Sequence, residues 1–291
     1  MPGQTQRQIR HLLEAAGLAP QHRLGQHFLV DLNLMRKLVA AADLSPLDTV
    51  LEVGAGTGSL TEILLSHGCR VVAVEVDHGL QALLRERLGG DAHFTLIQAD
   101  ALASKHRVNP LVLKVLTGLP PRAGRAYKLV ANLPYQIATP LLVDLLLVSP
   151  RFDRLVCTIQ KEVGQRLVAE PRAELYGPTS VVVQTLAHVT PHAIIPPQAF
   201  WPRPQVESVL LSIRPRAPES VEVQDVPGFV DFVRRAFQQR RKMLRRVLRH
   251  AGEPELLAAC QRAGVTAEAR PEDLGPSAWR RLFAALRPRS G

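Results

Sequence analysis

The sequence contains few cysteines and no long apolar run. Its 291 residues include three cysteines, Cys69, Cys157 and Cys260, which lie far apart and form no C-x-x-C pair. This spacing argues against a disulfide framework and against a zinc site. No apolar stretch reaches the ~18 residues of a membrane span, and the N-terminus is too polar for a signal peptide. We therefore expect a cytoplasmic protein with no membrane attachment and with buried, reduced thiols.

Aromatic residues and acidic residues are also scarce. Aromatic residues make up 4% of the chain against 46% for all hydrophobic residues, so Leu, Val and Ala must fill the core. There are 36 Lys and Arg against 26 Asp and Glu, which gives a net charge of +10. A basic excess of this size indicates a polyanionic partner, most often nucleic acid, with an inert basic surface as the alternative.

Strand-like and helix-like patterns alternate over the first two-thirds of the chain. Strands are expected at 49–53, 71–76, 93–100, 127–133 and 154–160. Repeated strand-then-helix units predict an α/β fold with a mostly parallel sheet and helices on both faces. The runs at 188–196 and 206–215 have no helical pattern between them and predict an antiparallel hairpin at one edge. The stretch 103–126, rich in Pro, Gly and basic residues, predicts an enlarged loop.

A proline-rich segment at 214–228 predicts a domain boundary. We accordingly expect an α/β domain at 1–216 and a small, basic, all-helical domain at 217–291. A helical pattern covers 229–250, and between residues 234 and 249 it carries eight basic residues and no acidic one. A helix of one charge sign predicts a surface that binds nucleic-acid phosphates. The residues that we expect to make this contact are Arg240, Arg241, Lys242 and Arg245.

A glycine-rich turn follows the first predicted strand. In LEVGAGTGSLT (51–61), glycines stand at strictly alternating positions. Glycine lets a backbone approach a ligand closely, and the next helix offers its N-terminus. The same features suit a dinucleotide site. However, the spacing differs from G-x-G-x-x-G and favours a tight loop beneath a nucleoside and an amino-acid tail, with contacts at Gly54 and Gly56.

Acidic residues end the second and third predicted strands. Glu75 can accept hydrogen bonds from both hydroxyls of a ribose, and Asp100 can accept one from an adenine amino group while Ala101 packs beside the ring. Either acid alone could equally be an ordinary residue at a strand end. Ligands bind at the carboxyl ends of strands in open α/β sheets. The turn and the two acids together therefore predict an S-adenosylmethionine site.

The fourth predicted strand ends in NLPY, residues 132–135. An adenine amino group is a poor nucleophile because its lone pair is delocalised into the ring. Acceptors at the Asn132 side-chain oxygen and the Leu133 carbonyl would hold its two N–H bonds and aim the lone pair. Pro134 fixes the turn without a competing N–H, and Tyr135 can stack on the purine, worth ~1–3 kcal/mol. These residues predict methyl transfer to adenine without a metal; an ordinary strand-to-helix turn is the alternative.

At this point the sequence, over residues 20 to 250, resembles the ribosomal RNA small-subunit adenine dimethyltransferases, the KsgA/RsmA family. The motifs that carry the resemblance are HRLGQHFLVD (22–31), EVGAGTGSLT (52–61), VEVD (74–77), QADAL (98–102), NLPYQIATP (132–140), IQKEVGQRLVAEPRAELYG (159–177), PPQAFWPRPQVESVL (196–210) and AFQQRRKMLRRVL (236–248). A DNA adenine methyltransferase, the related possibility, would have proline in place of Leu133.

The resemblance implies a Rossmann-like class I methyltransferase and a specific reaction. Two adjacent adenosines in the 3′-terminal hairpin loop of 16S rRNA would each receive two methyl groups on N6 during ribosome biogenesis. The enzyme would act as a monomer on the small subunit or its precursor. By resemblance, His27 and Leu29 join the residues above around the methyl donor, and Phe200 covers the face of the flipped base opposite Tyr135.

The chain departs from the family pattern at a few positions, and two other functions stay open. His27 stands where the family usually has Asn and could add pH dependence, and the bulky Trp201 could alter access to the pocket. EPRAELYG lacks the usual small residues after its proline, and the 103–126 stretch is long. The other functions are methylation of one adenosine in large-subunit rRNA, as in a sister group, and a non-catalytic assembly or transcription factor.

Overall fold

The computed structural model describes residues 3–105, 107–119 and 126–286, and the chain forms two compact units. The first unit comprises residues 1–164 and 190–214, and the second comprises 165–189 and 215–291. The second boundary lies close to the expected one at 216. Residues 165–189 differ from the expectation, because helix α8 (Pro178–Leu186) packs on two C-terminal helices and so belongs to the helical unit.

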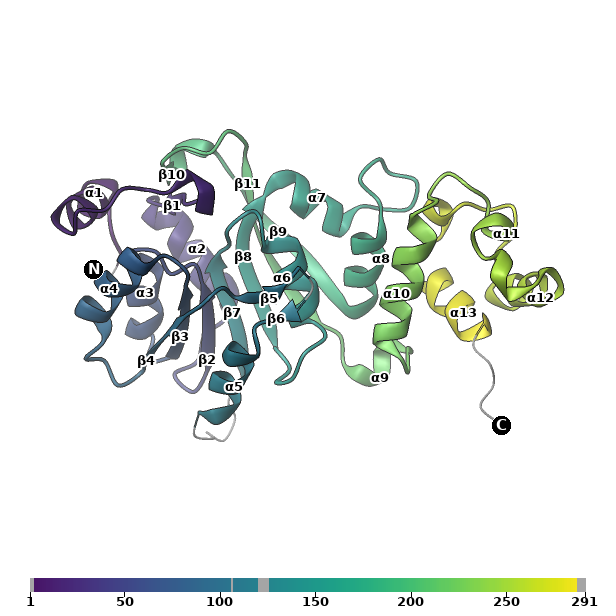
Figure 1. The fold of residues 1–291 in the computed structure, drawn as a ribbon, viewed down its shortest axis with the longest axis horizontal. Coiled ribbons are helices and arrows are strands. Elements are labelled where there is room, and N and C mark those ends of the chain that lie inside the picture. Colours follow the sequence, from purple (N-terminus) through teal and green to yellow (C-terminus); the bar gives the residue numbers. More distant parts are fainter. Residues whose placement is uncertain (1–2, 106, 120–125, 287–291) are drawn as a thin grey trace. The chain divides into compact units, whose positions relative to one another are not determined.

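A mostly parallel seven-stranded sheet forms the centre of the first unit (Figure 1). Its strands, in spatial order, are β4 (Phe94–Gln98), β3 (Arg70–Glu75), β2 (Thr49–Val53), β7 (Tyr127–Asn132), β8 (Arg154–Gln160), β11 (Ser208–Pro215) and β9 (Ala187–Ile195). The first five are parallel, whereas β11 runs antiparallel to β8. The predicted α/β class is confirmed, and the two late strands are adjacent at one edge as expected.

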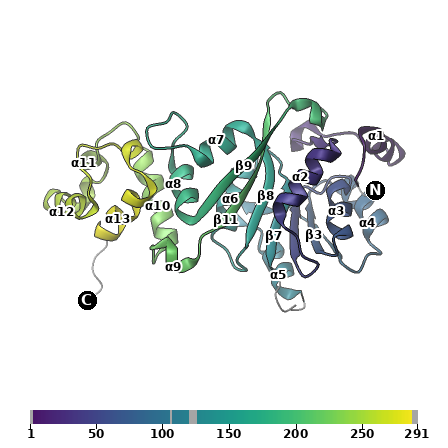
Figure 2. The same ribbon diagram turned by 180° about the vertical axis from the view of Figure 1, so that it is seen from behind.

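The central strands are buried on both faces because helices cover both sides of the sheet. Every residue of β2 is buried, which explains why TVLEV reads as an almost continuous apolar run. The helices of this unit are α1 (Gln6–Ala15), α2 (Leu32–Ala42), α3 (Ser59–Ser66), α4 (His78–Leu88), α5 (Pro110–Gly118), α6 (Ala138–Leu145) and the first half of α7 (Lys161–Val168). Figure 2 brings α2 to the front, on the sheet face opposite α5 and α6.

The stretch expected to be an enlarged loop contains regular structure instead. Two short strands, β5 (Leu102–Ser104) and β6 (Arg107–Val108), pair with each other and lead into α5. Asn109 caps this helix by accepting from the Leu111 N–H, and proline occupies its first turn, where it costs no hydrogen bond. The proline that we read as a loop signal therefore begins a helix. Residues 106 and 120–125 of that stretch lie outside the described residues.

A second small sheet ties the N-terminal segment to the loop before β11. Strand β1 (Phe28–Leu29) pairs with β10 (Phe200–Trp201) in antiparallel register, with Phe28 opposite Trp201 and Leu29 opposite Phe200. The Val30 N–H extends the pairing by donating to the Ala199 carbonyl at 2.8 Å. The GQHFL and AFWP motifs therefore lie side by side, although about 170 residues separate them.

The second unit is helical and has an aromatic core. Its remaining helices are α9 (Pro218–Val221), α10 (Val226–Phe237), α11 (Leu244–Val247), α12 (Glu253–Ala263) and α13 (Pro276–Leu286). Phe232 contacts both Trp279 and Phe283, with ring centroids 5.7 and 5.4 Å apart, and Phe237 joins Trp279 to Tyr176. Six of the thirteen aromatic residues lie in this unit, so aromatic rings join the expected Leu, Val and Ala in its core.

The helix expected over 229–250 is broken after Phe237. Turns follow, and the N–H groups of Leu244 and Arg245 donate to the carbonyls of Ala269 and Ala267 instead of to the preceding helical turn. Hydrogen bonds to residues 267 and 269 therefore replace helical hydrogen bonds at residues 244 and 245. A helical pattern within 229–250 cannot predict this pairing with a distant segment. Among the described residues, no helix is long and apolar enough to cross a membrane.

The central strands set the stability of the first unit. Leu129 of β7 is completely buried, whereas Leu111 of α5 is 46% exposed. Leu129→Ala leaves a cavity in the core, and we expect it to lower the free energy of unfolding by about 2–5 kcal/mol. The matched change Leu111→Ala should cost less than about 1 kcal/mol. Chemical denaturation of both variants measures the difference, and equal losses would contradict the assigned packing.

Candidate active site

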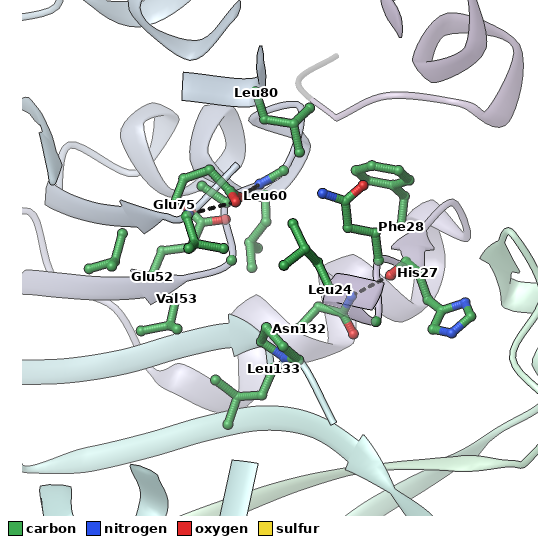
Figure 3. A pocket seen from close by; sticks show the side chains of 18 of the residues that line it. Leu24, His27, Phe28, Glu52, Val53, Leu60, Glu75, Leu80, Asn132 and Leu133 are labelled. Carbon is green, nitrogen blue, oxygen red and sulfur yellow. Dashed lines mark hydrogen bonds between the residues drawn. The ribbon is translucent and has the colours of Figure 1, made fainter. Parts of the chain in front are cut away.

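A cavity opens at the carboxyl ends of β2, β3, β4 and β7 (Figure 3). It brings together eleven residues that the sequence predicted for the donor and acceptor sites: His27, Leu29, Gly54, Gly56, Glu75, Asp100, Ala101, Asn132, Leu133, Pro134 and Tyr135. These residues come from five separate segments of the chain. Convergence at the strand ends is the expected position for a ligand site in an open α/β sheet.

The glycine-rich turn is packed so closely that side chains have no room. Gly54 has φ +76°, and a Cβ there would lie 3.2 Å from Cγ of Pro134. Gly56 has φ +60°, and a Cβ there would lie 3.0 Å from the Phe28 ring. Both positions therefore require glycine for backbone conformation as well as for space. The turn thus contacts both the NLPY segment and β1.

Glu75 is buried and held by three backbone N–H groups. Its Oε2 accepts from Gly56 at 2.9 Å, and its Oε1 accepts from Val76 and Asp77 at 2.8 and 2.9 Å. Burial raises the pKa of Glu75, while these hydrogen bonds oppose the rise. Oε2 keeps one further acceptor position. The expected pair of bonds to a ribose would therefore share oxygens already bonded to the protein, and it stays a prediction.

Glu52 is a second buried carboxyl in the cavity wall, and sequence reasoning missed it. It lies in β2, is 2% exposed, and accepts a hydrogen bond from the Thr61 hydroxyl at 2.7 Å. Burial, followed by the negative charge of Glu75, raises its pKa to about 8 despite that hydrogen bond. Glu52 is therefore mostly protonated at neutral pH. An acid inside the otherwise apolar run TVLEV was the signal available in the sequence.

Asp100 and Ala101 form the wall that follows β4. Asp100 is exposed, and its Oδ1 accepts from the Leu102 N–H at 2.9 Å. Its backbone carbonyl accepts from the Asn109 side chain at 2.9 Å, which fixes the turn. Ala101 is buried beside it. The exposed carboxylate is placed where a ligand donor can reach it, and its contact with adenine stays a prediction.

The Asn132 side chain is oriented by hydrogen bonds at both ends. Its Nδ2 donates to the His27 carbonyl at 2.7 Å, and its Oδ1 accepts from the Thr158 hydroxyl at 2.5 Å (Figure 3). Thr158 is the register partner of Asn132 on the adjacent strand β8 and is completely buried. Because the His27 carbonyl can only accept, the atom that faces it must be Nδ2. The amide oxygen therefore faces the Thr158 hydroxyl and keeps one acceptor position. Sequence reasoning missed Thr158.

Tyr135 lies at the acceptor side of the cavity with its ring fixed. Its hydroxyl shares a hydrogen bond of 2.8 Å with the Ser208 hydroxyl. The His27 ring stacks on it with centroids 5.7 Å apart and planes 29° from parallel. Because the Pro202 carbonyl can only accept, the His27 Nδ1 must donate to it over their 2.7 Å separation. The His27 ring thus points toward Tyr135, and Figure 3 shows it directed away from Glu75.

Phe200 is not brought to the cavity in this structure. It is 2% exposed and belongs to a core cluster with Leu29, Met35 and Leu60, and it is absent from the described lining of the cavity. Its pairing in β10 directs it into the core. The geometry gives no support for Phe200 as a wall of the base pocket.

The N-terminal segment is anchored over the cavity by polar side chains that the sequence did not reveal. Asp77 accepts from the side chains of Gln21 and Gln26 at 2.6 and 2.8 Å, while its other oxygen caps α4. Further back, the buried Gln4 exchanges hydrogen bonds with Thr57 in the glycine-rich turn. These bonds hold the segment that carries Leu24, Gly25 and His27 against the cavity.

The basic residues expected to bind RNA lie in the second unit and differ in exposure. Arg240 is tied to its own unit: it pairs with Glu272 and donates to the carbonyls of Glu174 and Ala173. The side chains of Arg241, Lys242 and Arg245 are exposed and make no hydrogen bond or ion pair with any described residue. RNA binding by these residues stays a prediction. No group of three His, Cys, Asp or Glu side chains that could hold a metal occurs among the described residues.

Comparison with known proteins finds one family over nearly the whole chain. The family model described as "Ribosomal RNA adenine dimethylase" matches residues 18–287. "Ribosomal RNA small subunit methyltransferase A" of Moorella thermoacetica is 40% identical over 94% of this chain and 93% of its own length. The protein of the same name from Parasynechococcus marenigrum is 40% identical over 93% of this chain and 88% of its own.

Two solved structures share the fold. A dimethyladenosine transferase from Plasmodium falciparum superposes with a TM-score of 0.69 at 22% identity, covering 89% of this chain and 96% of that one. The 23S rRNA methyltransferase ErmE superposes with a TM-score of 0.64 at 25% identity, covering 89% of this chain and 99% of that one. The mixed seven-stranded sheet is therefore a known methyltransferase architecture.

The raised pKa of Glu52 predicts a specific pH dependence of stability. Its folded-state pKa of about 8 exceeds the ordinary value of 4.5. Between these two pH values, Glu52 is protonated in the folded protein and ionised in the unfolded chain. Stability should therefore fall as pH rises from about 4.5 to 8, by on the order of a few kcal/mol. Glu52→Gln keeps an acceptor for Thr61 and removes this loss.

Denaturation of both proteins at pH 5, 7 and 9 provides the measurement. The Glu52→Gln variant should gain stability relative to the parent as pH rises, with the largest gain at pH 9. A stability difference that is the same at all three values would contradict the assigned titration.

Proposed function

The chain belongs to the ribosomal RNA adenine dimethylase family, and on this premise we propose that it dimethylates N6 of two adjacent adenosines in the 3′-terminal hairpin loop of 16S rRNA. The methyl donor is S-adenosylmethionine, and the substrate is the small ribosomal subunit or its precursor. We propose that the enzyme acts as a monomer in the cytoplasm during ribosome biogenesis, without a metal. The observation that carries the proposal is the doubly held Asn132 amide beside the glycine-rich turn and Glu75.

The cavity fits the proposed donor. Gly54 and Gly56 present backbone where a Cβ would collide with Pro134 or Phe28, so the turn approaches the cavity closely at these two positions. Glu75 keeps one acceptor position for a ribose hydroxyl, and Asp100 has an exposed carboxylate for an adenine amino group. The bound donor supplies a methyl group on a positively charged sulfur, which is already a good leaving group. The protein therefore needs to position the acceptor.

The acceptor adenine is held by Asn132 and Leu133. The remaining acceptor position of the Asn132 amide oxygen takes one N–H of the adenine amino group. The Leu133 carbonyl, which accepts no hydrogen bond from any described residue, takes the other. Two acceptors on the two N–H bonds direct the nitrogen lone pair toward the methyl carbon. The nitrogen releases a proton to water after each transfer.

Pro134 and Tyr135 complete the acceptor site. Proline has no N–H to compete for the two acceptors, and its ring packs against Gly54. Tyr135 offers a ring fixed by Ser208 on which the purine stacks. His27 covers part of this ring at 5.7 Å between centroids, so the imidazole must shift when a base enters from that side.

RNA binding by the second unit is supported by Arg241, Lys242 and Arg245. All three are exposed and are not paired with any described acid. Phosphate contacts of this kind give affinity that falls with salt and do not depend on base sequence. We therefore assign the helical unit to docking on rRNA.

Methylation of large-subunit rRNA is the competing function, because ErmE shares the fold. The relatives that are 40% identical over most of their length are small-subunit enzymes by name, which favours 16S rRNA. The deciding assay supplies the purified protein with S-adenosylmethionine and either unmethylated small subunits or large-subunit RNA. Mass spectrometry should find two adjacent dimethyladenosines in 16S rRNA; a single site in 23S rRNA would overturn the assignment.

Thr158 gives a sharp test of the acceptor geometry. Thr158→Val keeps the shape of a completely buried residue but removes the hydroxyl that donates to Asn132. The amide can then rotate, so kcat should fall about tenfold or more while affinity for S-adenosylmethionine changes little. Asn132→Ala should reduce kcat further.

Thr185→Val is the matched control, because the Thr185 hydroxyl is buried in the helical unit without a hydrogen-bond partner among the described residues. It should leave kcat unchanged. Equal kcat for the two threonine variants would refute the role given to Thr158.

A further inference from the structure

A phenyl ring, an indole and a guanidinium follow one another outward from the wall of the cavity. Phe28 lines the cavity, and its ring stacks on Trp201 with centroids 6.2 Å apart and planes 23° from parallel. Arg10 lies over the same indole, with its Cζ 5.0 Å from the ring centroid. The guanidinium is therefore at most about 11 Å from the Phe28 ring. None of these contacts is required by the methyl-transfer chemistry.

The fold fixes this arrangement from three directions. Phe28 and Trp201 are direct partners in the β1–β10 pairing, which places their rings together. Helix α1 is held by Ile9 and Leu13, which pack with Phe28 and with residues of α4. Ile9 also lines the cavity, whereas the next residue, Arg10, lies outside that lining and rests on Trp201. A capping box at Thr5 further secures the start of the helix.

Arg10 has no acidic partner in the part of the chain that the structure describes. Glu14 is four residues further along α1, yet no ion pair forms between them, and the Arg10 side chain makes no hydrogen bond. A guanidinium over an aromatic ring keeps its N–H donors free at its edge. The exposed Arg203, two residues from Trp201, likewise has no described partner. Two cations, one on Trp201 and one two residues from it in the chain, thus have donors available to an anion.

We propose that Arg10, held on Trp201, binds a backbone phosphate of the RNA strand that carries the target adenine. This rests on the proposed function and adds a contact in the first unit, separate from the basic residues of the helical unit. A planar fork of donors matches the oxygens of a phosphate. Trp201 acts as a platform that fixes the guanidinium before RNA arrives, which lowers the entropy lost on binding. The contact holds the strand in register while the adenine occupies the cavity.

The test compares Arg10→Met with Arg85→Met in otherwise full-length protein. Methionine keeps an unbranched apolar chain against the indole but removes the charge. Arg85 is an exposed arginine of α4 with no described partner, about two helical turns from the cavity end of that helix. The probe is the unmethylated small ribosomal subunit, with binding measured over a series of salt concentrations and S-adenosylmethionine affinity measured separately.

We expect Arg10→Met to weaken subunit binding about fivefold at low salt and to reduce the slope of log affinity against log salt by about 0.7, the value for one single-strand phosphate. S-adenosylmethionine affinity should stay within twofold, and Arg85→Met should match the parent. Trp201→Phe keeps a ring beneath Arg10, whereas Trp201→Ala removes it. If the two variants have equal melting temperatures, Trp201→Phe should bind the small subunit more tightly than Trp201→Ala.

Unchanged affinity and slope in Arg10→Met, alongside a parent protein that methylates small subunits, would overturn this inference and leave the proposed function intact. A parent protein that binds S-adenosylmethionine but neither binds nor methylates small subunits would overturn the proposed function and this inference together.

Discussion

The orientation of one side-chain amide determines what the cavity can do. Asn132 can present an acceptor to a ligand only because its nitrogen is bonded to the His27 carbonyl and its oxygen to the Thr158 hydroxyl. One partner comes from the N-terminal segment and the other from the neighbouring strand. The site is therefore complete only when β8 is in register and the N-terminal segment is docked.

Further hydrogen bonds at Asp77 dock the N-terminal segment. Asp77 both caps α4 and accepts from Gln21 and Gln26, so one buried carboxylate joins the start of a helix to the cover of the site. Glu75 similarly joins the glycine-rich turn to the segment that follows β3. The cavity walls are thus held by charged hydrogen bonds between backbone and buried acids, which are stronger than neutral ones.

The sequence was sufficient to predict those parts of the site that depend on local patterns. Glu75, Asp100 and Asn132 could be placed because each ends a recognisable strand, and strand ends meet at one edge of a parallel sheet. Thr158 could not, because its role comes from a register that joins two strands. Phe200 lies in the core because its direction is set by pairing with β1, far away in sequence, so its contact with a base stays a prediction. Local signals also failed for α5, which begins with a proline.

The helical unit is assembled from two separate stretches of chain, and this affects the order in which it forms. Helix α8 leaves the ribosome about 40 residues before α10 and about 90 before α13, the two helices on which it packs. Its apolar face therefore stays uncovered until the last helix has been synthesised. A chain shortened at the apparent boundary near residue 216 would keep α8 without its partners. Chaperone protection during translation matters more for this segment than for the sheet that precedes it.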